Sequence, residues 1–92
     1  MYGLSKEIYK KIIEIIKKYN YEFILFGSRA RGDYKANSDI DIAVEQVKEE
    51  DKYKIKNDFD LLDIPYTIDL VFIKENTNID LLKSIKNEGV IL

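Results

Sequence analysis

Two short segments of the chain carry aspartates at a spacing that could hold a metal ion. Asp39 and Asp41 flank Ile40 in an alternating apolar segment, so on a β-strand both carboxylates point to one face, about 7 Å apart. Asp69 stands inside a second apolar segment, residues 67–72, which is suited to burial on both faces and where a charge is rarely left unpaired. If the two strands are neighbours, the three carboxylates converge on one patch.

The chemistry that such a patch could perform is phosphoryl transfer. Carboxylate oxygens are preferred ligands of Mg²⁺, which keeps further positions for water and substrate phosphates. Three carboxylates suffice for two such ions roughly 3.5 to 4 Å apart, clamping the attacking and leaving oxygens. Two plainer interpretations stay open: a solvated strand face for Asp39 and Asp41, and a strand-end position in water for Asp69. The chain has no histidine, so base catalysis must come from a carboxylate or a metal-bound hydroxide.

A glycine-bounded turn supplies the complementary half of a phosphate site. Gly27-Ser28 follows a predicted strand, and a helical turn beginning there presents free backbone N–H groups to a phosphate. A Gly-Ser pair alone marks any turn, and this one lacks the spacing of a Walker A loop. The only two arginines of the chain, Arg29 and Arg31, lie in this turn, against thirteen lysines elsewhere. Arginine's planar fork suits phosphate, so we expect phosphate or partner contacts from both.

Composition limits the class of protein. A net charge of −2 argues against a surface that binds nucleic acid as a whole. No apolar run approaches a membrane span, the N-terminus does not resemble a signal peptide, and the lack of cysteine excludes a disulfide framework or a thiolate metal site. Ninety-two residues make one core, so we expect a single domain over residues 1–92, in the cytoplasm and without membrane contact.

The hydrophobic pattern predicts a small α/β or α+β domain that positions these residues. Apolar residues recur at helical spacing over 4–19, which predicts an amphipathic first helix. The other predicted elements are strands over 21–26, 40–44 and 66–73, a helical turn after Gly27, and helices over 47–62 and 78–87. The last helix should be capped by Thr77 or Asn78 and stop at Gly89. The apolar tail 90–92 should dock on the core or on a partner.

Taken together, Gly27-Ser28, ten residues and Asp39-Ile40-Asp41 resemble the signature of the DNA polymerase β-like nucleotidyltransferase superfamily. The full string GSRARGDYKANSDIDIAV, residues 27–44, is similar to its minimal nucleotidyltransferase branch, the antitoxin partners of HEPN-domain toxins. The resemblance covers the whole chain. It implies the nucleotidyltransferase fold, a small mixed β-sheet of three or more strands flanked by helices.

The resemblance also implies roles for individual residues. Gly27 and Ser28 would bind the nucleotide triphosphate. Asp39 and Asp41 would bind two Mg²⁺ ions, and Asp69 would match the third carboxylate, a ligand of the catalytic metal that activates the incoming hydroxyl. By this resemblance the substrate is ATP, the product is AMP on a tyrosine hydroxyl of the cognate HEPN toxin, and the two proteins form a hetero-oligomer.

The chain departs from larger relatives in lacking the extra domains that shape acceptor recognition. The acceptor must therefore come largely from outside, which favours a protein partner over a polynucleotide or a small molecule. Two alternatives remain beside this active protein adenylyltransferase. One is a non-catalytic antitoxin that neutralises its partner by complex formation, and the other is a nucleotidyltransferase acting on a small-molecule acceptor.

Overall fold

The computed structural model describes all 92 residues, and its elements follow the order predicted from the sequence, with one more strand at the end. They are α1 (Lys6–Ile16), β1 (Phe23–Phe26), α2 (Ser28–Arg31), β2 (Ile40–Glu45), α3 (Glu49–Asp60), β3 (Ile68–Ile73), α4 (Ile79–Glu88) and β4 (Val90–Ile91). α1 begins after the N-cap Ser5 and ends at Ile16, short of the predicted Tyr19. Tyr19 still packs against the core, which explains why the apolar period continues beyond the helix. None of the helices has the length and apolar character needed to cross a lipid bilayer.

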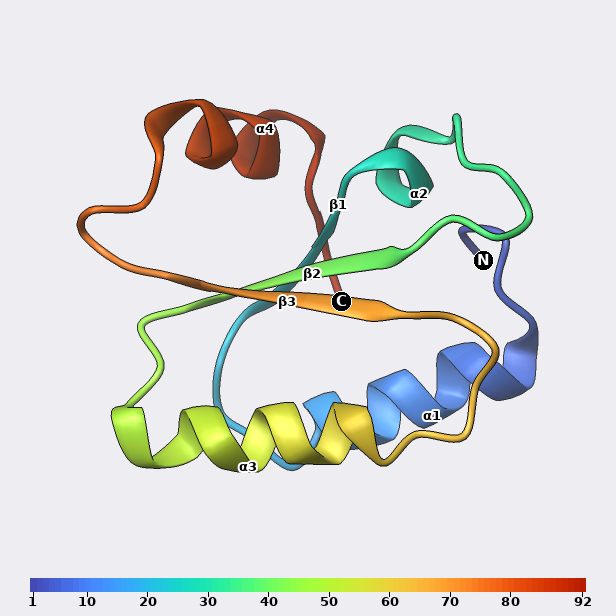
Figure 1. The fold of residues 1–92 in the computed structure, drawn as a ribbon, viewed down its shortest axis with the longest axis horizontal. Helices are drawn as coiled ribbons and strands as arrows, with labels where there is room; N and C mark the ends of the chain where they lie inside the picture. The colour runs from blue at the N-terminus through green and yellow to red at the C-terminus, as the bar shows by residue number, and fades with distance from the viewer.

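The four strands form one mixed sheet in the order β3-β2-β1-β4. β2 and β3 run parallel, connected through α3, whereas β1 is antiparallel to both of its neighbours (Figure 1). This is the small mixed sheet flanked by helices that the resemblance implies. The apolar tail docks on the core as the edge strand β4, where Leu92 donates its backbone N–H to the carbonyl of Phe23.

The end of α4 explains how the chain turns into β4. Asn78 is the N-cap, because its side chain accepts hydrogen bonds from the N–H groups of Asp80 and Leu81. The helix stops before Gly89, as predicted. A Cβ at Gly89 would collide with the carbonyl of Ile85 and would also press on a side chain of β1. Glycine therefore allows the chain to leave the helix and pair with β1 at once.

Helices cover both faces of the sheet, and the strand alternation assigns each residue to one of them. α1 and α3 cover one face and enclose the larger core cluster, which includes Ile40 and Ile42 of β2; α4 covers the other face with Ile85 at its centre (Figure 1). Because side chains alternate along a strand, Asp41 and Asp69 belong to the α4 face. The carboxylates therefore lie outside the larger core.

A phenol–carboxylate pair joins the two helices of the first face. The hydroxyl of Tyr19, just beyond α1, donates to Asp58 of α3 at 2.5 Å. Burial, followed by the hydrogen bond to Asp58 and the negative charge of that carboxylate, raises the pKa of Tyr19 to about 12. Tyr21 makes the same kind of bond to Asp51 at 2.5 Å. The two tyrosine hydrogen bonds hold the segment between α1 and β1 against α3.

Candidate active site

The three predicted carboxylates lie at the edge of the sheet where β2 and β3 begin. Asp41 and Asp69 are direct partners in the parallel register, so their backbones are one strand spacing apart, about 4.8 Å. Asp39 stands directly before β2. The two strands are thus neighbours, which is the condition that the sequence left open for the three carboxylates to converge. The burial expected of β3 on both faces is wrong, because β3 is an edge strand, its residues are at most half-buried, and Asp69 is exposed.

Electrostatic repulsion links the three carboxylates, which we call the acidic edge. Partial burial, followed by the negative charges of Asp69 and then Asp39, raises the pKa of the Asp41 carboxyl above its ordinary value. The positive charge of Arg31 opposes this shift. Asp41 is therefore a half-buried carboxylate whose charge is only partly compensated by the protein, and a cation on the acidic edge would relieve the repulsion.

Gly27 brings the predicted phosphate turn into contact with this edge. Phe26 pairs with Asp41 across the antiparallel β1–β2 ladder, and Gly27 follows with φ 77° and ψ −157°, a region that essentially only glycine occupies. A Cβ on Gly27 would overlap Oδ2 of Asp41. The carboxylate therefore occupies the space of the missing side chain. Ser28, half-buried, begins α2 at the same point, and the first N–H groups of a helix have no partners within it.

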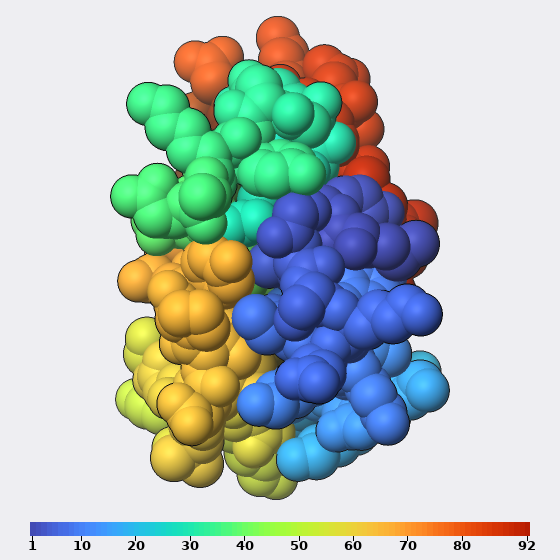
Figure 2. Space-filling view, turned by 90° about the vertical axis from the view of Figure 1, so that its right-hand side faces the viewer, coloured from blue at the N-terminus to red at the C-terminus, as the bar shows by residue number.

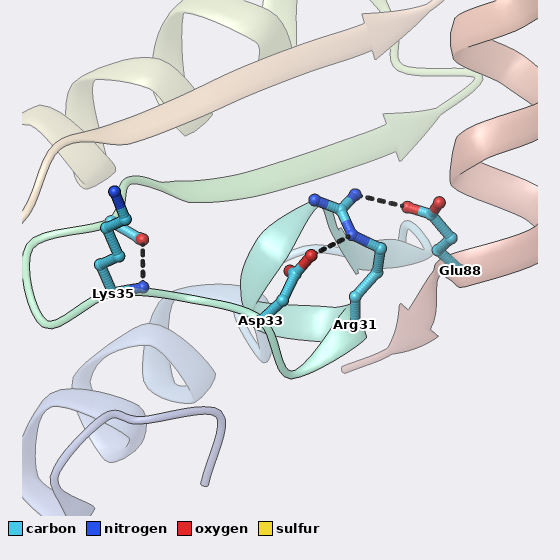
Figure 3. A network of polar contacts seen from close by, with 5 residues as sticks. Arg31, Asp33, Lys35 and Glu88 are labelled. Carbon is cyan, nitrogen blue, oxygen red and sulfur yellow. Dashed lines mark hydrogen bonds and ion pairs between the residues drawn. The ribbon is translucent and has the colours of Figure 1, made fainter.

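The two arginines of α2 have different surroundings. Arg31 is exposed and donates from Nε to Asp33 at 3.2 Å and from Nη1 to Glu88 of α4 at 2.9 Å (Figure 3). The hydrogen bond to Glu88, followed by that to Asp33, raises the pKa of the Arg31 guanidinium. Arg31 can therefore bind a phosphate by giving up its bonds to the exposed Asp33 and the half-buried Glu88. Arg29, in contrast, is 2% exposed and donates to backbone carbonyls, so its placement does not favour the expected phosphate or partner contact.

The donor set of the acidic edge suits Mg²⁺ chemically, although its side chains are not gathered as metal ligands. As they stand, no three acidic residues of the chain form a cluster that could hold one ion. Asp39 and Asp69 are exposed, so their carboxylates are free to rotate toward Asp41. Hard oxygen donors, and a repulsion at Asp41 that the protein only partly compensates, both fit a divalent cation.

The acidic edge lies outside the two large surface hollows. One of these, about 440 Å³, lies where the end of α1 meets α3, and the other, about 450 Å³, lies between α4 and the far ends of β2 and β3. None of the predicted site residues lines either hollow. The candidate site is therefore an open edge, which a large acceptor can approach.

Residues 10–92 match the family model described as polymerase beta, nucleotidyltransferase. The chain belongs to this family. It is similar to a solved structure described as a toxin–antitoxin with AMP-PNP, at 26% identity and a TM-score of 0.64, covering 89% of this chain and 69% of that one. A presumed nucleotidyltransferase from Sulfolobus solfataricus is also similar, at 26% identity and a TM-score of 0.55, covering 94% and 76%. No curated protein sequence is similar enough to count as a match.

Two of the contacts around the site, one at Arg31 and one at Arg29, have no signal in the sequence. Glu88 reaches Arg31 from α4, and nothing in the spacing of residues so far apart indicates such a pair. The sequence also gives no indication that the guanidinium of Arg29 lies over the rings of Tyr34 and Tyr66. Tyrosines in two separate polar segments carry no periodic signal, so only the folded chain reveals that they meet.

Proposed function

We propose that this nucleotidyltransferase domain uses Mg²⁺ and ATP to transfer AMP to a tyrosine hydroxyl of a partner protein, a HEPN-domain toxin. The observation that carries the proposal is the meeting of Gly27, Asp41 and Asp69 at one sheet edge, by steric contact and by strand register. A phosphate-binding turn and an acidic edge at one place are what transfer of a nucleotide requires. Because the substrate is ATP, we assign the reaction to the cytoplasm.

The residues divide the work as follows. The free N–H groups and hydroxyl of the Gly27-Ser28 turn hold the triphosphate, with Arg31 turning to its oxygens. Asp39, Asp41 and Asp69 would hold two Mg²⁺ ions, which supply positive charge to the triphosphate and the acceptor oxygen. Asp69, exposed at the edge, accepts the proton of the acceptor hydroxyl. The acceptor oxygen then forms a bond to the α-phosphorus as the bond to the β-phosphate oxygen breaks and pyrophosphate leaves.

A partner protein as acceptor is supported by two observations. The acidic edge is open and lies outside both large hollows, so it does not enclose a small acceptor. A similar structure is described as a toxin–antitoxin with AMP-PNP, a nucleotide analogue. A toxin whose tyrosine enters the open edge would complete the site from outside.

The test is transfer of label from α-labelled ATP to a co-expressed HEPN protein in the presence of Mg²⁺. We expect one AMP per toxin by intact mass, a modified tyrosine by peptide mapping, and no transfer after chelation of the metal. Asp41→Asn and Asp69→Asn should abolish the label, whereas Asp63→Asn, an exposed aspartate away from the edge, should not. Label transfer by Asp69→Asn at the normal rate, or neutralisation of the toxin without any AMP on it, would contradict the proposal.

A further inference from the structure

Arg29 is a buried cation without a carboxylate partner. Its guanidinium donates from both Nε (3.1 Å) and Nη2 (2.8 Å) to the carbonyl of Ser38, and from Nη1 to the carbonyl of Tyr2 at 3.0 Å. Its central carbon lies 5.3 Å from the ring centroid of Tyr34 and 4.6 Å from that of Tyr66. A buried charge is costly unless it is well compensated, so this set of two carbonyls and two aromatic rings must hold together around it.

The partners of Arg29 come from segments far apart in the chain. The N-terminal residues, the loop after α2 and the segment before β3 meet on one face of the molecule, where Figure 2 shows them in dark blue, green and orange. Gly3 fits this junction because a Cβ there would collide with the ring of Tyr34, and its φ of 73° suits glycine. We call Arg29 with Tyr2, Ser38, Tyr34 and Tyr66 the arginine junction.

The arginine junction is connected directly to both halves of the acidic edge. Ser38, whose carbonyl receives the bidentate bond, precedes Asp39. Tyr66 leads into the strand that carries Asp69, and Thr67 next to it accepts a hydrogen bond from the N–H of Ile40 at 2.9 Å. Both segments that enter β2 and β3 are thus fixed on Arg29.

We propose that Arg29 is a positioning residue for the acidic edge: its guanidinium fixes Ser38 and Tyr66 so that Asp39 and Asp69 are held beside Asp41. This inference rests on the proposed function, because it assigns the acidic edge a metal to hold. It replaces the phosphate contact that the sequence indicated for Arg29. A lysine cannot take over this role, since an ammonium lacks the planar fork that donates to the Ser38 carbonyl from two nitrogens and faces aromatic rings at the same time.

Arg29→Lys tests the proposal, with Phe59→Leu as a control that loosens the larger core cluster under α3 without removing any hydrogen bond or ring contact of Arg29. Binding of Mn²⁺ to the full chain without nucleotide, followed by electron paramagnetic resonance, measures the edge itself. We expect Arg29→Lys to weaken Mn²⁺ binding by about 10- to 100-fold, the usual effect of losing a group that orients metal ligands. Phe59→Leu should lower the melting temperature but leave Mn²⁺ affinity unchanged.

Amide hydrogen exchange gives a second measurement that needs no metal. The N–H of Ile40 should exchange faster in Arg29→Lys than in the parent chain, while that of Ile42, deeper in β2, should change no more than in Phe59→Leu. Equal Mn²⁺ affinity, or unchanged exchange at Ile40, in folded Arg29→Lys would overturn the positioning role. A parent chain that binds no Mn²⁺ and transfers no AMP would instead overturn the proposed function, while exchange at Ile40 would still report whether Arg29 holds the edge.

Discussion

Replacing Gly27 by alanine perturbs the contact between the phosphate turn and the acidic edge, and Gly32 at the other end of α2 provides a matched control. Gly27 has φ 77° and ψ −157°, where a non-glycine residue costs about 2 to 3 kcal/mol. Gly32 has φ 92° and ψ 3°, a left-handed conformation that costs about 1 to 2 kcal/mol. Both variants therefore lose stability for the same kind of reason.

Of the two alanine variants, only Gly27→Ala places its new methyl group against a residue of the site. At Gly27 the new Cβ overlaps Oδ2 of Asp41, whereas at Gly32 nothing lies within 4 Å of it. The Asp41 carboxylate is the free end of a short side chain, so it rotates away at little cost in stability. The steric effect of Gly27→Ala is therefore a displaced carboxylate, added to the backbone strain.

Thermal unfolding and AMP transfer measured on the same samples separate the two effects. Each kcal/mol lowers the melting temperature by roughly 4 to 8 °C in a domain of this size, so both variants should stay folded in a cold assay if the parent is of ordinary stability. We expect Gly27→Ala to lose about 100-fold in transfer rate, as misplacement of a reacting group by about 1 Å does. Gly32→Ala should stay close to the parent. If folded Gly27→Ala transfers AMP as fast as Gly32→Ala, the contact with Asp41 is irrelevant to the site and the reasoning is refuted.

Three further predictions concern the electrostatics and packing of the domain. Because the pKa of Asp41 is raised in the folded chain, ionisation of its carboxyl opposes folding. The free energy of unfolding should therefore fall as the pH rises from the ordinary carboxyl range through the folded pKa. Asp41→Asn should raise the melting temperature at pH 7, and this gain should shrink below about pH 4. In an ultraviolet titration Tyr19 should ionise near its pKa of about 12. Asp58→Asn should lower this pKa, because it removes the negative charge that the phenol faces, and an unmoved step would refute the pair. Gly89→Ala should lower stability and loosen β4, because its Cβ meets the carbonyl of Ile85, and unchanged exchange of the Leu92 N–H would contradict this.

The sequence contained enough information for the order of the elements and for the two strands that carry the carboxylates. From the alternation around Asp41 and Asp69 the sequence predicts these strands, and it left open their pairing, which the parallel register of β2 and β3 establishes. It could not reveal that β3 is an edge strand, because half-buried and fully buried apolar strands read alike. The exposure of Asp69 follows from that position.

The two arginines show where residue type stops being informative. Both stand in one turn of four residues, yet Arg31 is exposed and pairs with Asp33 and Glu88, whereas Arg29 is buried. A buried guanidinium needs partners from the whole fold, and carbonyl groups such as those of Tyr2 and Ser38 are present in every residue, so the sequence has no sign of them. The sequence does not predict a short strand such as β4 either, because two residues are too few to show the alternation of apolar and polar side chains that marks a strand.

The parallel pairing of β2 with β3 also bears on the order in which the molecule is built. β1 and β2 are antiparallel neighbours, and a short connection through α2 joins them. β3, which carries Asp69, pairs with β2 only after the chain has passed through the longer helix α3. Closing such a loop is slow compared with forming local contacts. Until β3 has paired with it, one side of β2 has unpaired backbone N–H and C=O groups, which can pair with another chain. The three carboxylates of the acidic edge are thus brought together in the same step that pairs the open side of β2, so we expect a chain emerging from the ribosome to acquire the proposed metal site only when this side of β2 has been covered.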